Sequence, residues 1–146
     1  SVVIILDNSI TGMTGHQQNP TTGYNIKGDP AAAVSLEKLC EAVGISRVQV
    51  CDPYDLKQTM RVIREELEAE GPSVIISRRP CALLKYVKHK PSLRVESSRC
   101  IGCKACLAIG CPAISMKEGK AAIDHTQCVG CGVCTGLCPK QAITES

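Results

Sequence analysis

The chain has 146 residues, enough for one ordinary domain or two small ones, and its formal net charge of +3 is too mild to favour nucleic-acid binding. It contains three Tyr, no Phe and no Trp, so its eleven Cys are the obvious substitute for aromatic core residues. No apolar segment is long enough for a signal peptide or a membrane span. We therefore expect a soluble, cytoplasmic protein whose clustered cysteines bind metal instead of forming disulfides.

Residues 1–90 are predicted to form an α/β unit, in which strands and helices alternate around a parallel sheet with covered faces. The expected strands are residues 2–7, 47–51 and 74–77. The sequence opens with Ser1 directly before the first apolar strand, so we interpret the chain as a fragment that starts inside a domain.

Helices are expected between these strands. The first is AAAVSLEKLCEAVG (residues 31–44), for which Asp29 is a suitable N-cap and Pro30 a suitable first helical residue. The second covers residues 55–70, with an apolar face composed of Leu56, Met60, Ile63 and Leu67. A short helix is also expected at the start of residues 78–94, which continue as a basic linker. This linker is interpreted either as a solvated connector or as a surface for an anionic partner or a substrate phosphate.

Residues 91–146 are predicted to form a second domain, and residues 92–146 of it form an internal repeat. Each half contains a cysteine run, a Cys-Pro pair and a small apolar pair. The segment SMKEGKAAIDHTQ between the two halves is predicted to form a hairpin that turns at Glu118-Gly119. A module of about 55 residues with almost no large apolar side chains cannot be stable by burial alone, so it needs an inorganic core.

The two cysteine runs predict two [4Fe-4S] clusters. Each run places three cysteines at the spacing Cys-x2-Cys-x2-Cys, and in two-cluster ferredoxins the fourth ligand is the Cys-Pro of the other run. The expected ligands are Cys100, Cys103, Cys106 and Cys138 for cluster 1, and Cys128, Cys131, Cys134 and Cys111 for cluster 2. Two structural zinc sites are the alternative, although zinc ligands usually come as separated pairs. We expect an α+β domain of the bacterial ferredoxin type.

Eight thiolates around two oxidised cubane cores would change the formal charge of +3 to about −1. Small residues between the cysteines would let backbone N–H groups approach the sulfur atoms and raise the reduction potential. The remaining cysteines, Cys40, Cys51 and Cys81, are interpreted as packing residues. Cys81 is the one near enough in sequence to the cluster domain to suggest a further redox role.

The loop LDNSITGMTGHQ (residues 6–17) follows the first strand. Ligands of open α/β sheets bind at the carboxyl ends of the strands, so this loop is either a binding site or an ordinary polar loop. The side-chain oxygen of Asn8 and the carbonyl of Ile10 could hold Mg²⁺ together with substrate phosphates. His16 could perform proton chemistry near pH 7, or could hydrogen-bond the loop backbone.

This loop, the segments YNIKGDP and CDPYD, and the two cysteine runs together resemble the alpha subunits of indolepyruvate:ferredoxin oxidoreductases. These belong to the 2-oxoacid:ferredoxin oxidoreductases, which use thiamine diphosphate. The resemblance covers nearly the whole chain. It implies that residues 1–90 are the C-terminal half of a thiamine-diphosphate-binding domain, whose upstream Gly-Asp motif and activating glutamate are not in this sequence.

The resemblance also implies a set of site residues. Asn8 and Ile10 would hold the Mg²⁺ that anchors the diphosphate, Ile10 through its carbonyl. The residues that would lie beside thiamine diphosphate are Asn8, Ile10, Thr11, Met13, Thr14 and Gly15. Ile10 and Gly12 replace the Thr and Ala expected from the family, and because Ile10 would contribute its carbonyl alone, the first replacement changes little.

The activity implied by the resemblance is the oxidative decarboxylation of an aryl 2-oxoacid, indolepyruvate. Coenzyme A would take the acyl group, and the two clusters would pass electrons to external ferredoxin. A beta subunit would complete the enzyme, and the fragment alone would be inactive. Two alternatives remain open: a pure electron-transfer protein of the ferredoxin type without thiamine, and a relative that acts on another 2-oxoacid.

Overall fold

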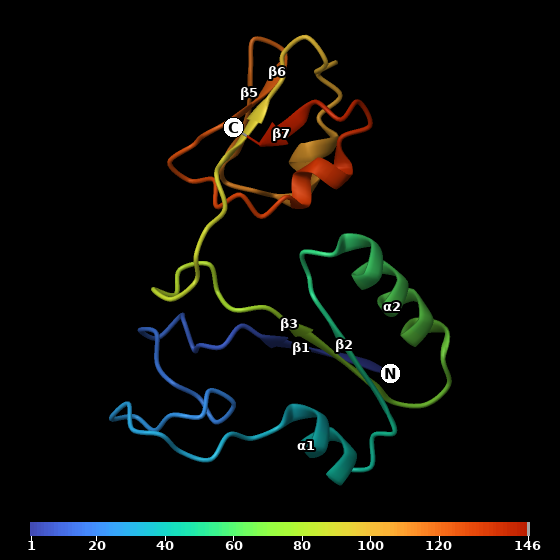
Figure 1. Ribbon diagram of the computed structural model, residues 1–146. Coiled ribbons are helices and arrows are strands. Elements are labelled where there is room, and N and C mark those ends of the chain that lie inside the picture. Colours follow the sequence, from blue (N-terminus) through green and yellow to red (C-terminus); the bar gives the residue numbers. More distant parts are fainter. Residues whose placement is uncertain (146) are drawn as a thin grey trace. The chain divides into compact units, whose positions relative to one another are not determined.

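The computed structural model describes residues 1–145, which separate into two compact units. The first unit is Ser1–Val87 and the second begins at Lys88 (Figure 1). Each unit is described by itself. The assignment of residues 1–90 and 91–146 to two functional domains stays a prediction.

The first unit contains a three-stranded parallel sheet. Its strands are β1 (Val2–Asp7), β2 (Arg47–Cys51) and β3 (Ser73–Arg78), in the order β1-β3-β2. Ile75 of the central strand aligns with Ile4 of β1 and with Gln49 of β2. The central strand is buried on both faces, which explains its continuous apolar sequence. The predicted parallel sheet is confirmed.

The two helices of this unit cover opposite faces of the sheet (Figure 1). Helix α1 (Leu36–Ala42) contributes Cys40 to a core that contains Val74 and Ile76. Helix α2 (Leu56–Glu68) contributes Val62 to a second core that contains Ile75 and Cys51. Because neighbouring residues of a strand point to opposite faces, β3 supplies both cores.

The predicted start of the first helix is wrong. Helix α1 begins at Leu36, and its N-cap is Ser35, whose hydroxyl accepts the N–H of Lys38. A helix from residue 31 would need the N–H of Val34 to donate to the carbonyl of Pro30, but this N–H and that of Ala31 bond to the preceding loop. Ala31 donates to the carbonyl of Gly23 at 2.9 Å, and Val34 donates to the carbonyl of Pro20 at 2.8 Å.

Part of the predicted apolar face of α2 is wrong, although Ile63 packs against the core as expected. Val62 and Glu66 are the buried residues of the helix, whereas Met60 and Leu67 are 50% and 67% exposed. The carboxylate of Glu66 forms two hydrogen bonds with Arg47, both of 3.0 Å. A buried carboxylate of this kind is tolerated because it is paired.

The short helix expected at the start of residues 78–94 is absent from the described chain. Two successive turns take its place, with bonds from Leu84 to the carbonyl of Cys81 and from Val87 to the carbonyl of Leu84. The N–H of Cys81 donates to the carbonyl of Asn8 at 2.9 Å, so this segment is attached to the loop after β1.

The second unit contains two small antiparallel sheets and two 3-10 helices (Figure 1). Strands β5 (Ile114–Lys117) and β6 (Lys120–Ile123) form the predicted hairpin. Its turn residues Glu118 and Gly119 both have positive φ, as a two-residue hairpin turn requires. Strands β4 (Leu93–Val95) and β7 (Ile143–Glu145) form the other sheet.

The 3-10 helices η1 (Ala105–Ile109) and η2 (Val133–Leu137) each carry the third cysteine of a run, Cys106 or Cys134. Both cysteines are buried in the core of this unit. The other buried members of that core are Leu93, Ile114, Ala121 and Ile143. Cysteines and small apolar residues therefore fill the interior in place of aromatic side chains, and the predicted α/β and ferredoxin-like fold classes are confirmed.

Among the residues that the structure describes, none of the helices has the length and hydrophobicity that a bilayer span requires.

Candidate functional site

The eight cysteines of the second unit lie in two groups, and each group includes one cysteine from the opposite run. A small cavity brings together Cys100, Cys103, Cys106 and Cys138. Cys131, Cys111 and Cys128 lie close enough to Cys134 to act electrostatically on its thiol. The structure thus places together the same sets that the sequence predicted, with Cys138 and Cys111 exchanged between the runs.

The electrostatics of the buried thiols oppose ionisation without a cation. Burial raises the pKa of Cys106, and the nearby Cys138, Cys100 and Cys103 raise it further. Burial raises the pKa of Cys134 to about 11, with the nearby Cys131 as the next largest unfavourable contribution. A bound metal would reverse this balance, because a coordinating thiol is deprotonated by the charge of the ion.

Backbone N–H groups are directed at three of the sulfur atoms. The distances to sulfur are 3.5 Å from Ala121 to Cys100, 3.4 Å from Leu93 to Cys128 and 3.2 Å from Ala142 to Cys138. The N–H groups of Ala121 and Gly102 lower the pKa of Cys100. Hydrogen bonds of this kind stabilise thiolate charge and tune the potential of a bound cluster.

Two glycines between cysteines are required by close backbone approach. A Cβ atom at Gly102 would lie 2.3 Å from the carbonyl oxygen of Gly119. A Cβ atom at Gly130 would lie 2.3 Å from the carbonyl oxygen of Pro91. Each cysteine loop is therefore pressed against another segment of the same unit, and this contact holds the first two cysteines of the run in place.

These residues fit iron–sulfur clusters. Within residues 1–145, no three His, Cys, Asp or Glu side chains are arranged around a single metal ion. A cubane sets a different requirement, because each thiolate binds its own iron atom. Four thiols around a cavity with mainly apolar walls, with N–H groups directed at the sulfur atoms, meet that requirement.

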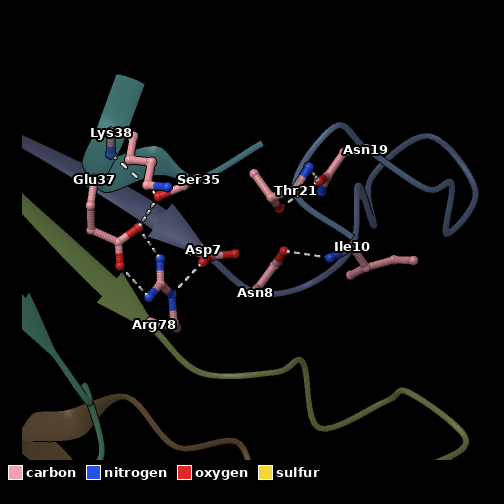
Figure 2. A network of polar contacts seen from close by, with 9 residues as sticks. All are labelled: Asp7, Asn8, Ile10, Asn19, Thr21, Ser35, Glu37, Lys38 and Arg78. Carbon is pink, nitrogen blue, oxygen red and sulfur yellow. Dashed lines mark hydrogen bonds and ion pairs between the residues drawn. The ribbon is translucent and has the colours of Figure 1, made fainter. Parts of the chain in front are cut away.

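The first unit gathers polar residues at the carboxyl ends of its strands. The guanidinium of Arg78, at the end of β3, donates to Asp7 at the end of β1 at 2.7 Å, and to Glu37 of α1 at 2.7 Å and 3.2 Å (Figure 2). Its hydrogen bond is the main reason that the pKa of Glu37 falls to about 2. This network joins both strand ends to the first turn of α1.

Asn8 follows Asp7 directly. Its side-chain oxygen accepts the N–H of Ile10 at 3.2 Å, which closes a tight turn around Ser9 (Figure 2). The side chain of Ile10 is buried, so the turn is fixed from both ends. A groove beside the turn is lined by Asn8, Ile10 and Thr11, and by Asn19 and Thr21 of the following loop.

The groove presents oxygen atoms of the kind that a hard cation binds, set among mainly apolar residues. Its polar lining is made of amide and hydroxyl groups and the carboxylate of Asp7, which Arg78 neutralises. The side chain of Asn19 is itself fixed because it accepts the N–H of Thr21 at 2.9 Å and its hydroxyl at 2.7 Å (Figure 2). Oxygen ligands of this type suit Mg²⁺, which shares them with phosphates.

The remaining residues expected beside the cofactor lie at the tip of the loop. The backbones of Thr11 and Gln17 pair at 3.0 Å and 3.1 Å and close a small hairpin. The enclosed tip is exposed, and it contains Met13, Thr14, Gly15 and His16. The structure therefore brings Asn8, Ile10 and Thr11 together at the groove. The roles of these residues and of the tip residues at a cofactor stay predictions.

Sequence reasoning missed the charged residues at the strand ends. Besides Arg78, Asp7 and Glu37, the next residue Arg79 pairs with Asp52 at 2.7 Å and 2.6 Å. A signal was present: acidic residues lie at the ends of β1 and β2, and two arginines lie at the end of β3, the strand between them. Because parallel strands end at one edge, opposite charges at successive strand ends predict ion pairs there.

Comparisons with known proteins agree with both units. The model of the family described as "Thiamine pyrophosphate enzyme, C-terminal TPP binding domain" matches residues 1–77, and that of the "4Fe-4S dicluster domain" matches residues 99–142. The chain belongs to the thiamine pyrophosphate enzymes, through the C-terminal binding domain of that family, and carries an iron–sulfur domain after it.

Within this class, the chain is similar over nearly its whole length to the indolepyruvate oxidoreductase subunit IorA, which confirms the predicted resemblance. It is 42% identical to the IorA of Pyrococcus horikoshii over 94% of this chain and 22% of the relative, and 41% identical to that of Thermococcus kodakarensis over 97% and 23%. It is 30% identical to the 2-oxoglutarate synthase subunit KorB of Methanocaldococcus jannaschii over 60% of this chain and 40% of the relative. The chain spans about a quarter of the length of the IorA proteins that it matches.

Proposed function

We propose that this chain is part of an indolepyruvate:ferredoxin oxidoreductase. The complete enzyme decarboxylates the 2-oxoacid oxidatively, transfers the acyl group to coenzyme A and passes the electrons through two [4Fe-4S] clusters to ferredoxin. A beta subunit completes it. The main observation in support is that the eight cysteines lie in two sets of four, each with one cysteine from the opposite run. The same chain contains a domain of the thiamine pyrophosphate enzyme family.

Each unit has a distinct role in this proposal. When bound, thiamine diphosphate supplies the carbanion chemistry and the clusters accept single electrons. The side-chain oxygen of Asn8 and the carbonyl of Ile10 hold the Mg²⁺ that binds the diphosphate. Arg78 fixes Asp7 and thereby positions the turn that begins at Asn8. The eight cysteines bind the two clusters as predicted.

The experiment requires the complete alpha subunit together with its beta subunit, reconstituted anaerobically with iron and sulfide. We expect thiamine diphosphate and Mg²⁺ to be required for indolepyruvate-dependent reduction of ferredoxin. Pyruvate and 2-oxoglutarate serve as competing substrates, and preference for either would correct the substrate while retaining the enzyme class.

A pure electron-transfer protein is the second candidate. It is favoured by a match of 48% identity over 46 residues to a protein of the ion-translocating oxidoreductase complex of Methanosarcina acetivorans, a match that covers 30% of this chain. A protein that binds both clusters but has no measurable affinity for thiamine diphosphate with Mg²⁺ would support this candidate and refute the enzyme.

A further inference from the structure

The internal repeat allows the surroundings of the two sets of four cysteines to be compared position by position. In the first run, Gly102 lies against the backbone carbonyl of Gly119. In the second run, the equivalent Gly130 lies against the backbone carbonyl of Pro91. The sulfur of Cys100 accepts the N–H of Ala121, and that of Cys128 accepts the N–H of Leu93. The residue before Ala121, Lys120, therefore corresponds to Ser92, the residue before Leu93.

This comparison shows an asymmetry of charge. Lys104, after the second cysteine of the first run, corresponds to Gly132 in the second run. Lys120 corresponds to Ser92, as shown above. Lys140 belongs to a two-residue insertion between Pro139 and the small apolar pair, which the first run does not have. At all three positions, lysine is found at the cluster 1 group and a neutral residue or a gap at the cluster 2 group.

The three lysines lie at the thiols of cluster 1. Lys104 and Lys140 line the cavity between those cysteines. The ammonium of Lys120 donates to the carbonyl of Cys100 at 2.6 Å and to that of Ser97 at 2.9 Å. Glu118 of the neighbouring hairpin turn is acidic, so the region retains an excess of positive charge.

The same side of the unit is open to solvent. Cys103 is exposed, and its neighbour Ile101 is 61% exposed. The corresponding Cys131 and Val129 of the second run are half-buried. We call the surface formed by Ile101, Cys103, Lys104, Lys120 and Lys140 the cluster 1 rim.

We propose that the cluster 1 rim is the surface at which electrons leave the protein, and that it binds an acidic one-electron carrier protein. This inference rests on the proposed function, because it requires both clusters. Positive charge around an exposed patch attracts an acidic partner and accelerates productive encounter. The exposed edge also allows the carrier to approach cluster 1 more closely than cluster 2.

The lysines favour cluster 1 as the last electron site for a second reason. A reduced cluster carries one more negative charge, and nearby cations stabilise that state, so cluster 1 has a higher potential than cluster 2. In the exit step, the reduced cluster loses one electron and the carrier gains it. No bond forms or breaks, and no proton moves.

The test uses the complete alpha subunit with reconstituted clusters and purified, oxidised acidic ferredoxin as the probe. The double variant Lys104→Glu/Lys140→Glu reverses the charge of the rim. Lys90→Glu/Arg94→Glu is the matched control, because both residues are exposed in the same unit, and the carbonyl of Lys90 lies beside Gly130 of the second run. Calorimetry at low and high salt measures binding, and a redox titration followed by electron paramagnetic resonance measures the cluster potentials.

We expect the rim variant to weaken ferredoxin binding at low salt by about tenfold or more, and the difference to shrink at high salt. The control should change affinity by less than about twofold. The rim variant should also lower the potential of one cluster and leave the other unchanged. Equal weakening by both variants, or unchanged binding by the rim variant, would overturn the exit surface. Iron content separates the two failures: a protein without iron refutes the proposed function, whereas a fully loaded protein with unchanged binding refutes the rim alone.

Discussion

The guanidinium of Arg78 donates to the carboxylate of Asp7 at 2.7 Å, across the carboxyl ends of two neighbouring parallel strands (Figure 2). The same guanidinium binds Glu37 of α1. Asp7 immediately precedes Asn8, whose side chain closes the turn to Ile10. An ion pair thus holds the residue that precedes the turn proposed to bind Mg²⁺, although Arg78 itself belongs to a distant part of the sequence.

The first prediction concerns this ion pair. In the complete alpha subunit, Arg78→Gln should weaken the binding of thiamine diphosphate with Mg²⁺ by about tenfold, which corresponds to about 1.4 kcal/mol. The reason is that Asp7 loses its partner and the turn after it is no longer fixed. Calorimetric titration with the cofactor measures the effect without turnover.

The matched control for this prediction is Arg47→Gln/Glu66→Gln, which removes an ion pair without leaving a buried charge unpaired. Arg47 also forms an ion pair with a carboxylate, that of Glu66, but it lies at the amino end of β2. Ligands of parallel sheets bind at the opposite edge, where the carboxyl ends of the strands lie. Affinity should be unchanged in this variant. Equal losses in both variants would mean that general destabilisation, and not the position of the turn, explains the effect.

The second prediction concerns Asn8 directly. Asn8→Ala should weaken cofactor binding and leave the iron content intact, because the clusters belong to the other unit. Asn8→Asp keeps a side-chain oxygen for the metal and for the N–H of Ile10, so it should retain most of the affinity. If Asn8→Ala binds the cofactor as tightly as the unmodified protein, Asn8 does not belong to the site.

The third prediction concerns pH. The folded-state pKa of Glu37 is about 2, below its ordinary value of 4.5, chiefly because of the hydrogen bond from Arg78. A lowered carboxyl pKa stabilises the folded state above pH 4.5, and this contribution is lost as the pH falls towards about 2. The difference in unfolding free energy between the unmodified protein and Glu37→Gln should therefore be constant from about pH 7 to about pH 5 and decrease below that range.

Tyrosine fluorescence during urea unfolding can measure this difference. The chain has no Trp, and its three tyrosines, Tyr24, Tyr54 and Tyr86, all lie in the first unit. The signal therefore reports on the unit that contains Glu37. A difference that already changes between about pH 7 and about pH 5 would contradict the lowered pKa.

The fourth prediction separates backbone conformation from close contact. Gly102 and Gly110 have similar φ angles of 69° and 64°, but only the Cβ at position 102 would meet backbone, at 2.3 Å. Gly110→Ala should cost about 1 kcal/mol and keep the full iron content. Gly102→Ala should displace the loop that carries Cys100 and Cys103 and lose cluster 1. Equal iron content in the two variants would show that the close approach is not needed.

The sequence predicted those features that depend on local pattern. The spacing of Cys100, Cys103 and Cys106 implies a cluster loop wherever it occurs, and the apolar segments of the first unit specified its strands. The helix start at Asp29 was wrong, since loop contacts to Ala31 and Val34 override a good capping sequence. These hydrogen bonds join residues whose separation in the sequence follows no helical or strand periodicity.

The helix α2 and the polar site show the same limit. The apolar periodicity selected Met60 and Leu67, but the helix buries Glu66 because Arg47 of a neighbouring strand pairs with it. The pair of Asp7 and Arg78 is separated by 71 positions, so the charges at the strand ends indicate it only in combination with the order of strands in the sheet.

The central claim is that two clusters are bound by exchanged cysteines, and the iron content of Cys103→Ala/Cys138→Ala tests it most directly. The unmodified protein should contain about eight irons after anaerobic reconstitution. The double variant should contain about four, as one intact cubane, because both cysteines belong to cluster 1. The account would be contradicted by zinc in place of iron in the unmodified protein, or by partial iron loss from both clusters in the double variant.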